Sequence, residues 1–422
     1  MKVDTRLVAL LGALAPLLAS PGAAALDAIE VGEWKIDFSG NINGFASDVK
    51  CESPAGGGTV AGGLACGSTS GGDYDANNIR TGLLPSWLGF HAEKTDGDNK
   101  YGVMIGFQPG IDGGNQNAIT GSPLDGGLGL NSENLRQVYL EWSGNWGGIK
   151  VGRDLGLFGS DAILSDMTLL GVGTVSDLTR GGGNTSLGRI GVGYIYADWK
   201  GQIQYSSPKL GGFQFNVALV DPWGLVNLSG QSLNAGATSF NQEGSTYGLE
   251  GKAAFSFGDP KEFNGKVWVS AISQEIKSAG GFGSEDALGY DVGAKVGLAG
   301  FEVVGYYYQG EGIGTTGFLF DAVDLGGNAR DSDGFYAQAT FKLPGIGTKI
   351  GASFGESNLD LGPADLPGSP LVSKNESIVV GIYHPLTSFL NLVAEYTQTK
   401  STAHNGAEAK ETAIAIGAIL FY

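Results

Sequence analysis

The strongest constraint on the fold is an alternation of apolar and polar residues with a period of two. At 33–45 the stretch EWKIDFSGNINGF puts aromatic and aliphatic side chains on one face and polar side chains on the other. The alternation returns near 101–107, 213–219, 247–255, 290–298 and 390–396, where the polar faces include Glu250, Lys252, Asp291, Lys295 and Glu395. Because successive side chains of a strand point to opposite faces, each segment predicts a β-strand with one apolar face.

The connections between these segments alternate in length. Short turns such as KTDGDN and LPGIG are interleaved with long stretches rich in Gly, Ser, Asn and Asp, at 50–77, 109–132, 222–244, 309–331 and 356–374. Glycine supplies 74 of the 422 residues, well above its average share, which fits many strands joined by many turns. Strands with this spacing number about sixteen, and an even number is expected of a closed bacterial barrel.

Two all-β architectures contain alternating strands. A soluble β-sandwich packs its apolar faces on a second sheet, whereas an outer-membrane barrel turns them to lipid and keeps charged residues in a wet lumen. Here the polar faces carry ionised residues, and the apolar faces tend to begin or end on Trp, Tyr or Phe. These features favour a transmembrane antiparallel β-barrel of about 16 strands.

The N-terminal segment predicts export. Lys2 and Arg6 precede the apolar run LVALLGALAPLLA, and small residues then lead to a cleavage site after Ala25. The alternative, a membrane anchor, would need a longer apolar run. We therefore assign residues 1–25 to a signal peptide. Residues 26–422 form one barrel domain, because no linker or change in composition divides them.

Charge and cysteine content limit the partners. The net charge of −18 argues against nucleic acid, whose phosphates bind basic surfaces. Cys51 and Cys66 flank a glycine-rich loop, and in an exported protein such a pair predicts a disulfide. The alternative, a metal or redox pair, lacks the CxxC spacing and a nearby histidine.

No motif predicts an enzyme. His91, His384 and His404 lie far apart in the sequence and have neither HExxH spacing nor a serine partner. The stretch DSDG at 331–334 begins like a calcium loop, but Lys342 stands where the glutamate ligand belongs. Accordingly, we predict no catalytic residue, metal site or cofactor.

Several stretches together resemble the trimeric general porins of Gram-negative outer membranes, and most of all their DcaP-like branch. GQIQYSSPKLGGFQFNVAL is similar to a strand, turn and strand of that family, and GGIKVGRD followed by LGLFGSDAILSDMTLLGVG resembles its fifth strand leading into its third loop. Tyr422, the closing aromatic, resembles the signal that the barrel-assembly machinery reads. The family's Pro-Glu-Phe-Gly-Gly signature is absent, and MTLLGVG stands in its place.

The resemblance implies a constriction loop at about 155–188, folded into the lumen and carrying Asp161 and Asp166. The positions that match the family's arginine ladder on the opposite wall are Arg80, Arg136 and Arg189, with Arg153 nearby as a further pore-lining candidate. Guanidinium groups stay charged in a poorly hydrated throat, so facing rows of acids and arginines would make a transverse field. Strict alternation would point Arg136 at lipid, unless a bulge or the end of the strand redirects it.

These expectations imply a water-filled channel in the outer membrane, through which small hydrophilic solutes and ions diffuse passively, with a preference for anionic or dipolar solutes such as carboxylates. The expected partners are membrane lipid, lipopolysaccharide, the assembly machinery and two further copies in a homotrimer. The alternative is an adhesin or receptor that uses its long acidic loops. Closure of the barrel further predicts that Ile414–Tyr422 pairs with Glu33–Asn43.

Overall fold

The computed structural model of the chain describes residues 28–66, 72–111, 136–175, 185–231, 246–259, 262–277 and 284–422. The predicted signal peptide, residues 1–25, lies outside the described residues, as do parts of several predicted long connections. Within the described part of the chain, no helix has the length and apolar character needed to cross a membrane.

Nearly all of the regular structure is β-strand. The strands are β1 (Ile29–Val31), β2 (Trp34–Glu52), β3 (Tyr74–Arg80), β4 (Trp87–Asp96), β5 (Asn99–Phe107), β6 (Gln137–Gly144), β7 (Gly147–Leu155), β8 (Trp199–Ser206), β9 (Phe213–Val220), β10 (Gly248–Gly258), β11 (Phe263–Lys277), β12 (Ser284–Leu298), β13 (Phe301–Glu311), β14 (Asp331–Lys342), β15 (Lys349–Leu359), β16 (Val372–Pro385), β17 (Leu390–Ala403) and β18 (Glu408–Phe421). The short helical segments are η1 (Ala55–Gly57), α2 (Ser160–Ser165) and η2 (Met167–Leu170).

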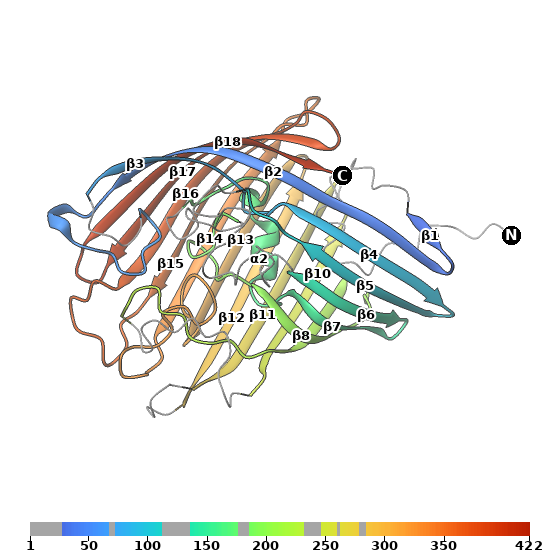
Figure 1. Cartoon of the computed structure of the whole chain (residues 1–422), viewed down its shortest axis with the longest axis horizontal. Helices are drawn as coiled ribbons and strands as arrows, with labels where there is room; N and C mark the ends of the chain where they lie inside the picture. The colour runs from blue at the N-terminus through green and yellow to red at the C-terminus, as the bar shows by residue number, and fades with distance from the viewer. Residues whose placement is uncertain are drawn as a thin grey trace, which may run out of the picture.

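One antiparallel sheet contains all of these strands and closes on itself (Figure 1). On one side β2 pairs with β18, and on the other it pairs first with β4 and then with β3. The strands β3 and β4 therefore form one barrel strand that is interrupted at 81–86, and β1 is a short addition beside β2. The barrel has sixteen strands, which confirms the predicted fold class.

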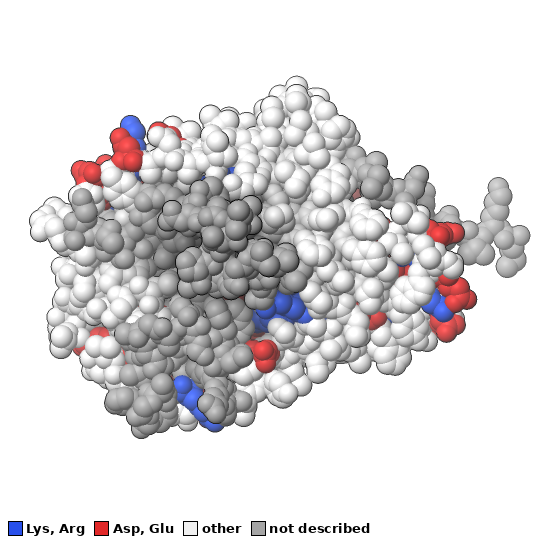
Figure 2. All heavy atoms as spheres, viewed as in Figure 1, with Lys and Arg blue, Asp and Glu red and all other residues white. Residues whose placement is uncertain are grey.

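The alternation of the sequence separates an apolar outer wall from a polar inner wall. Apolar side chains that are more than half exposed on the outer wall include Ile42, Leu140, Ile203, Val303 and Ile416. Buried polar side chains on the inner wall include Asn41, Asn43, Gln202, Ser270 and Glu395. In Figure 2 charged side chains are seen at the left and right ends of the molecule, and a further group of blue and red lies below its middle. The apolar outer wall is the surface that a bilayer requires of a barrel.

The last strand closes the barrel in a register that differs from the predicted one. Leu420 lies opposite Ile42 and Lys410 opposite Glu52, so β18 pairs with the later part of β2. The early part of β2 extends beyond the end of β18, because tilted strands must be staggered to close a barrel. Beyond the last ladder pair, the backbones of Tyr422 and Gly40 exchange two hydrogen bonds of 2.9 and 3.0 Å. The end of the chain is therefore fixed to the wall.

Candidate functional site

The connection between β7 and β8, residues 156–198, runs inside the barrel, and Figure 1 shows α2 within the lumen. We call this segment the lumen loop; residues 176–184 of it lie outside the described residues. Its apolar side chains Leu157, Phe158, Ile163 and Met167 are buried. Phe158 and Ile163 belong to one apolar cluster with inward side chains of the barrel wall. The structure thus confirms the predicted inward fold of the loop.

Two wall carboxylates hold the start of the lumen loop by its backbone. Glu250 on β10 accepts the N–H groups of Leu157 and Phe158, the latter at 3.1 Å, while its other oxygen pairs with the buried Lys200. Asp291 on β12 accepts the Gly159 N–H at 2.9 Å. Hydrogen bonds to an ionised acceptor are roughly twice as strong as neutral ones, so these contacts fix the entry of the loop.

A third carboxylate, Glu395 on β17, holds the middle of the loop. One oxygen accepts the N–H groups of Val172 at 2.7 Å and Gly173 at 2.8 Å, and the other accepts the Tyr383 hydroxyl at 2.6 Å. A Cβ atom at Gly171 would lie 2.1 Å from the carboxylate, so glycine is needed there for this close approach. The loop is therefore fastened to opposite parts of the barrel wall.

Asp161 of α2 pairs with lysines and not with an arginine. Its carboxylate lies 3.3 Å from the Lys252 ammonium and also contacts Lys266, on β10 and β11. Burial by itself raises the pKa of Asp161. The ammonium groups of Lys252 and Lys266 lower this pKa by a larger amount, so the net pKa is below the ordinary value. Asp161 thus fastens α2 to the lysine-bearing wall.

Asp166 and Arg189 are buried within the packing of the lumen loop. Asp166 accepts the Thr168 N–H and the Tyr194 hydroxyl, each at 2.9 Å. Arg189 donates to the Ser353 hydroxyl and, at 3.1 Å, to a wall carbonyl on β16. Asp166 therefore stabilises the loop internally, and Arg189 attaches it to the wall.

Arg80 and Arg136 lie at the ends of strands. Arg80 is buried and donates to the Val175 and Thr185 carbonyls at 3.2 and 3.3 Å, and so connects the two described parts of the loop. Arg136 immediately precedes β6, is buried, and donates to the Tyr196 hydroxyl at 3.4 Å. The end of the strand has freed Arg136 from the outward direction that alternation would impose.

Arg153 is not directed into the lumen by its strand. It lies opposite Val138 and Gly201 in the ladder and has the same parity as Val151, which is exposed on the outer wall. The structure therefore does not contain the expected row of arginines facing a row of loop acids. Instead, most of the predicted charged residues attach the loop to the wall, because a buried charge needs partners and the loop backbone supplies them.

Below the lumen loop, toward the short turns, lies a group of lysines that we call the lysine wall: Lys266, Lys295 and Lys349, on β11, β12 and β15. Lys266 and Lys295 are directly opposite each other in the ladder, an unfavourable arrangement for like charges. Lys295 lies 2.9 Å from Glu302, and the Lys349 ammonium lies 4.7 Å from the centre of the Tyr383 ring. Besides Asp161, Glu302 is the acid that pairs with this wall in the described part of the chain.

A second group, which we call the acid wall, consists of Asp37, His91 and Glu141 on β2, β4 and β6. The His91 ring lies between the two carboxylates, 3.4 Å from Asp37 and 3.8 Å from Glu141. The strands β4 and β12 are separated by the same number of strands in both directions around the barrel, so the acid wall and the lysine wall lie on opposite sides of the lumen. Basic and acidic side chains therefore do face each other across the lumen, but they are not the residues that the sequence predicted.

A cavity of about 120 Å³ lies between the lumen loop and the acid wall. One end is bordered by Arg136 and Gln137, and the other end by the acid wall. Its middle is lined by apolar residues of the loop and of the 81–86 interruption. We call it the wall cavity, and it gives the lumen an open side beside the loop.

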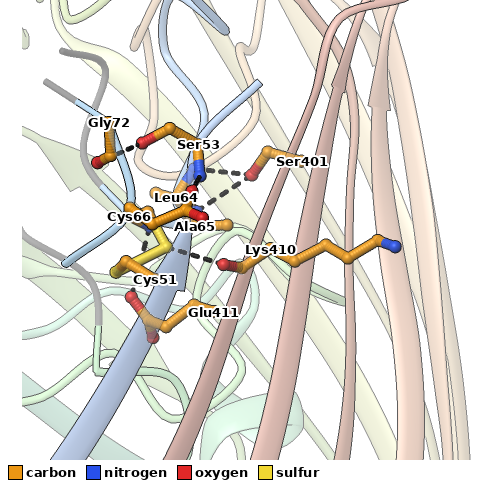
Figure 3. Close-up of a disulfide and its surroundings, with 10 residues drawn as sticks. Cys51, Ser53, Leu64, Ala65, Cys66, Gly72, Ser401, Lys410 and Glu411 are labelled. Carbon is orange, nitrogen blue, oxygen red and sulfur yellow. Dashed lines mark hydrogen bonds between the residues drawn. A yellow bond between two sulfur atoms is a disulfide. The ribbon is translucent and has the colours of Figure 1, made fainter. Parts of the chain in front are cut away.

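The predicted disulfide joins Cys51 on β2 to Cys66, with Cα atoms 5.2 Å apart. Figure 3 shows the bond beside the barrel wall, where the Cys66 N–H donates to Glu411 at 3.3 Å and the neighbouring Ala65 N–H donates to Ser401 at 3.0 Å. The disulfide and these bonds hold the loop after β2 down against the inner wall.

The lysine and acid walls were not among the predicted site residues, although the sequence contained their signal. Asp37 and Lys295 both fall on the polar faces of predicted strands. Counting strands around a closed sixteen-stranded sheet would have placed those two faces across the lumen from each other. Their positions along the barrel axis depend on strand stagger, which the sequence does not give.

Comparisons with known proteins agree with this architecture. A family model described as Gram-negative porin matches residues 9–404. A search of curated proteins finds no match. Among solved structures, the outer membrane channel DcaP of Acinetobacter baumannii is similar with a TM-score of 0.64, 16% sequence identity and coverage of 94% of this chain and 100% of that chain.

Two further solved structures are similar. The anion-selective porin from Comamonas acidovorans has a TM-score of 0.58 and 15% identity, with coverage of 92% of this chain and 100% of that chain. The trimer form of OmpT from Vibrio cholerae has a TM-score of 0.50 and 13% identity, with coverage of 92% and 99%. At these identities the likeness concerns the fold.

Proposed function

This chain belongs to the Gram-negative porin family and is an outer-membrane channel for the passive diffusion of small hydrophilic solutes; from this premise we propose that it favours dipolar and anionic solutes. The observation that carries the proposal is the lysine wall facing the acid wall across the lumen. A dipolar solute passing between them gains by turning its negative end to the lysines and its positive end to the acids. An apolar solute makes no favourable electrostatic interaction with either wall.

The preference for anions rests on the balance of charge at the lysine wall. Lys266, Lys295 and Lys349 share two acids, Asp161 and Glu302, so this wall carries an excess of positive charge. Charges in the outer loops act weakly at this depth, because the Debye length is about 8 Å at physiological salt. The charges nearest to the solute therefore outweigh the net charge of the whole chain.

A salt gradient across a planar bilayer tests the proposal. We expect the reversal potential of the unmodified channel to indicate anions, and the double variant Lys295→Gln with Lys349→Gln to move the permeability ratio toward cations by roughly threefold. Lys410→Gln on the outer face is the matched control, because it removes the same charge far from the lumen. A reversal potential that the double variant leaves unchanged would contradict the proposal. A barrel that carries no current would instead favour the role of adhesin or receptor.

The predicted charged residues have a place in this proposal. Arg80, Asp166 and Arg189 hold the lumen loop in the position that narrows the channel, and Arg136 borders the route through the wall cavity. Substitutions of Arg80, Asp166 or Arg189 would therefore change the conductance indirectly, by shifting the lumen loop. Arg153, on the outward parity of β7, lies near Tyr196 of the lumen loop.

We also propose that the channel is a homotrimer in contact with outer-membrane lipid and lipopolysaccharide, inserted by the barrel-assembly machinery through its C-terminal aromatic. One support is the similar fold of OmpT, which is described in a trimer form. Current steps that close in thirds in single-channel recordings would agree with this proposal, and a single conductance level with a monomeric mass in detergent would contradict it.

A further inference from the structure

The wall cavity has an apolar middle that diffusion of hydrophilic solutes does not require. Its lining includes Leu83, Leu84 and Pro85 from the 81–86 interruption, and Leu164 and Leu169 from the lumen loop. Leu84, Leu164 and Leu169 are partly exposed. Contact between apolar side chains and water is unfavourable, so the cavity offers apolar area that a solute with apolar side chains can cover.

Trp87, in the lining of the same cavity, carries an unused hydrogen-bond donor. Its side chain is more than nine-tenths buried, and its indole N–H has no hydrogen-bond partner among the described residues. Cβ atoms at Gly89 and Gly106 would lie 2.2 and 2.6 Å from the ring, so the indole rests on a part of the wall that two glycines leave free. A buried donor without a partner is costly and suits a solute that brings an acceptor oxygen.

The acid wall bounds the other end of the cavity. Asp37, His91 and Glu141 line it, and the two carboxylates share the single imidazole of His91. Lys150 lies opposite Glu141 in the ladder but pairs with Asp154, which leaves the imidazole as the basic group that contacts both carboxylates of this group. This end therefore favours a cationic group such as an ammonium.

The distance between the two polar ends limits the size of the solute. The Glu141 side chain lies over Gly102 of β5, where a Cβ atom would be 2.8 Å from its carboxylate, and the Trp87 nitrogen lies over Gly106 of the same strand. Four residues of a strand span about 13 Å. Two hydrogen bonds of about 2.9 Å each leave roughly 7 Å, which is the length of two residues of extended chain.

We propose that the wall cavity is a subsite for zwitterionic dipeptides with apolar side chains. The ammonium group lies at Glu141 and Asp37, a carboxylate oxygen accepts the Trp87 indole N–H, and the side chains contact Leu84, Leu164 and Leu169. The inference rests on the proposed channel function and specifies one class of dipolar solute.

The test measures how dipeptides interrupt the ion current of the complete channel in a planar bilayer. We expect leucyl-leucine to halve the current at a concentration about tenfold lower than glycyl-glycine, because the latter lacks the apolar side chains. N-acetylation of leucyl-leucine removes the ammonium group, and the concentration that halves the current should rise about tenfold. Glu141→Gln should weaken the block by leucyl-leucine about tenfold as well.

Glu408→Gln is the matched control, since it removes a carboxylate of an exposed ion pair outside the wall cavity and should leave the block unchanged. The N-acetylated peptide probes the same contact without altering the protein, so a folding defect in Glu141→Gln does not decide the result. Equal block by leucyl-leucine and glycyl-glycine, or an equal effect of the Glu141 and Glu408 variants, would overturn the inference. The salt-gradient measurement uses no peptide, so failure of the lysine-wall proposal is recorded separately.

Discussion

Glu395 is the clearest case of a single side chain that holds the lumen loop. Its inward direction follows from the alternation of the segment at 390–396, but its partners, Val172 and Gly173, lie 223 and 222 residues away in the sequence. No sequence pattern predicts a contact between residues so far apart. The sequence can therefore place the carboxylate in the lumen and leaves open what it binds.

Glu395→Gln should destabilise the protein and loosen the loop. The amide keeps the shape of the side chain but loses the charge that strengthens the bonds to two backbone N–H groups, so we expect the free energy of unfolding to fall by about 1–3 kcal/mol. Denaturant titration in lipid vesicles measures this change, and single-channel recordings should show larger fluctuations of the open current. Glu408→Gln, which breaks an exposed ion pair, should cost well under about 1 kcal/mol. Equal effects of the two variants would refute the fastening role.

Asp161 predicts a dependence of stability on pH. Its pKa is lower in the folded protein than in the unfolded chain, so the unfolded chain takes up the proton first as the pH falls. The stabilisation by Asp161 is therefore complete above the ordinary aspartate pKa and is lost as the pH falls through the lower, folded value. Asp161→Asn should reduce the free energy of unfolding by about 1–3 kcal/mol near neutral pH, and the difference from the unmodified protein should vanish in strong acid.

Unfolding measured at several pH values checks this expectation. The exposed Asp360 supplies the control variant Asp360→Asn, which should change stability little at any pH. A difference for Asp161→Asn that stays constant down to strong acid would show that its ion pairs with Lys252 and Lys266 do not provide the stabilisation.

At the scale of elements, the period-two pattern predicted the strands, their faces and the closed barrel. The pattern did not predict that β3 and β4 are two parts of one strand, because the interruption at 81–86 contains apolar residues that line the wall cavity. It also did not give the register between β18 and β2. Register in a closed barrel is set by strand tilt and by the turns together, and no single strand contains that information.

The disulfide fastens the element that follows β2. Its two cysteines are 15 residues apart, and a closed loop of that size is worth about 3 kcal/mol in the chain-entropy model. We expect the double variant Cys51→Ala with Cys66→Ala to lose about that much unfolding free energy. Reduction of the unmodified protein should give the same loss, and a reducing agent should leave the double variant unaffected. An effect of reduction on the double variant would point to a cause other than this bond.

At the scale of the whole molecule, closure depends on the pairing of β2 with β18. Removal of Leu420–Tyr422 deletes the last pairs with β2 and the two hydrogen bonds between Tyr422 and Gly40. The gap exposes unpaired backbone groups to lipid, where each costs several kcal/mol, so we expect assembly in the membrane to fail. Heat-modifiable migration on gels and protection from protease report the assembled barrel. Tyr422→Phe keeps the aromatic ring and should assemble normally; its failure would show that the hydroxyl group, and not strand closure, is what matters.

The wall carboxylates also set an order of events during folding. The hydrogen bond from Phe158 needs Glu250, which lies 92 residues further along the chain. The hydrogen bond from Val172 needs Glu395, which lies 223 residues further along. Contacts between such distant residues form late, because the chain entropy of closing the loop must be overcome first. The lumen loop can dock fully after β17 has joined the sheet, when the barrel is nearly complete. A narrow channel is thus a property of the finished barrel, and an intermediate stalled before β17 would carry a loose loop inside an open wall.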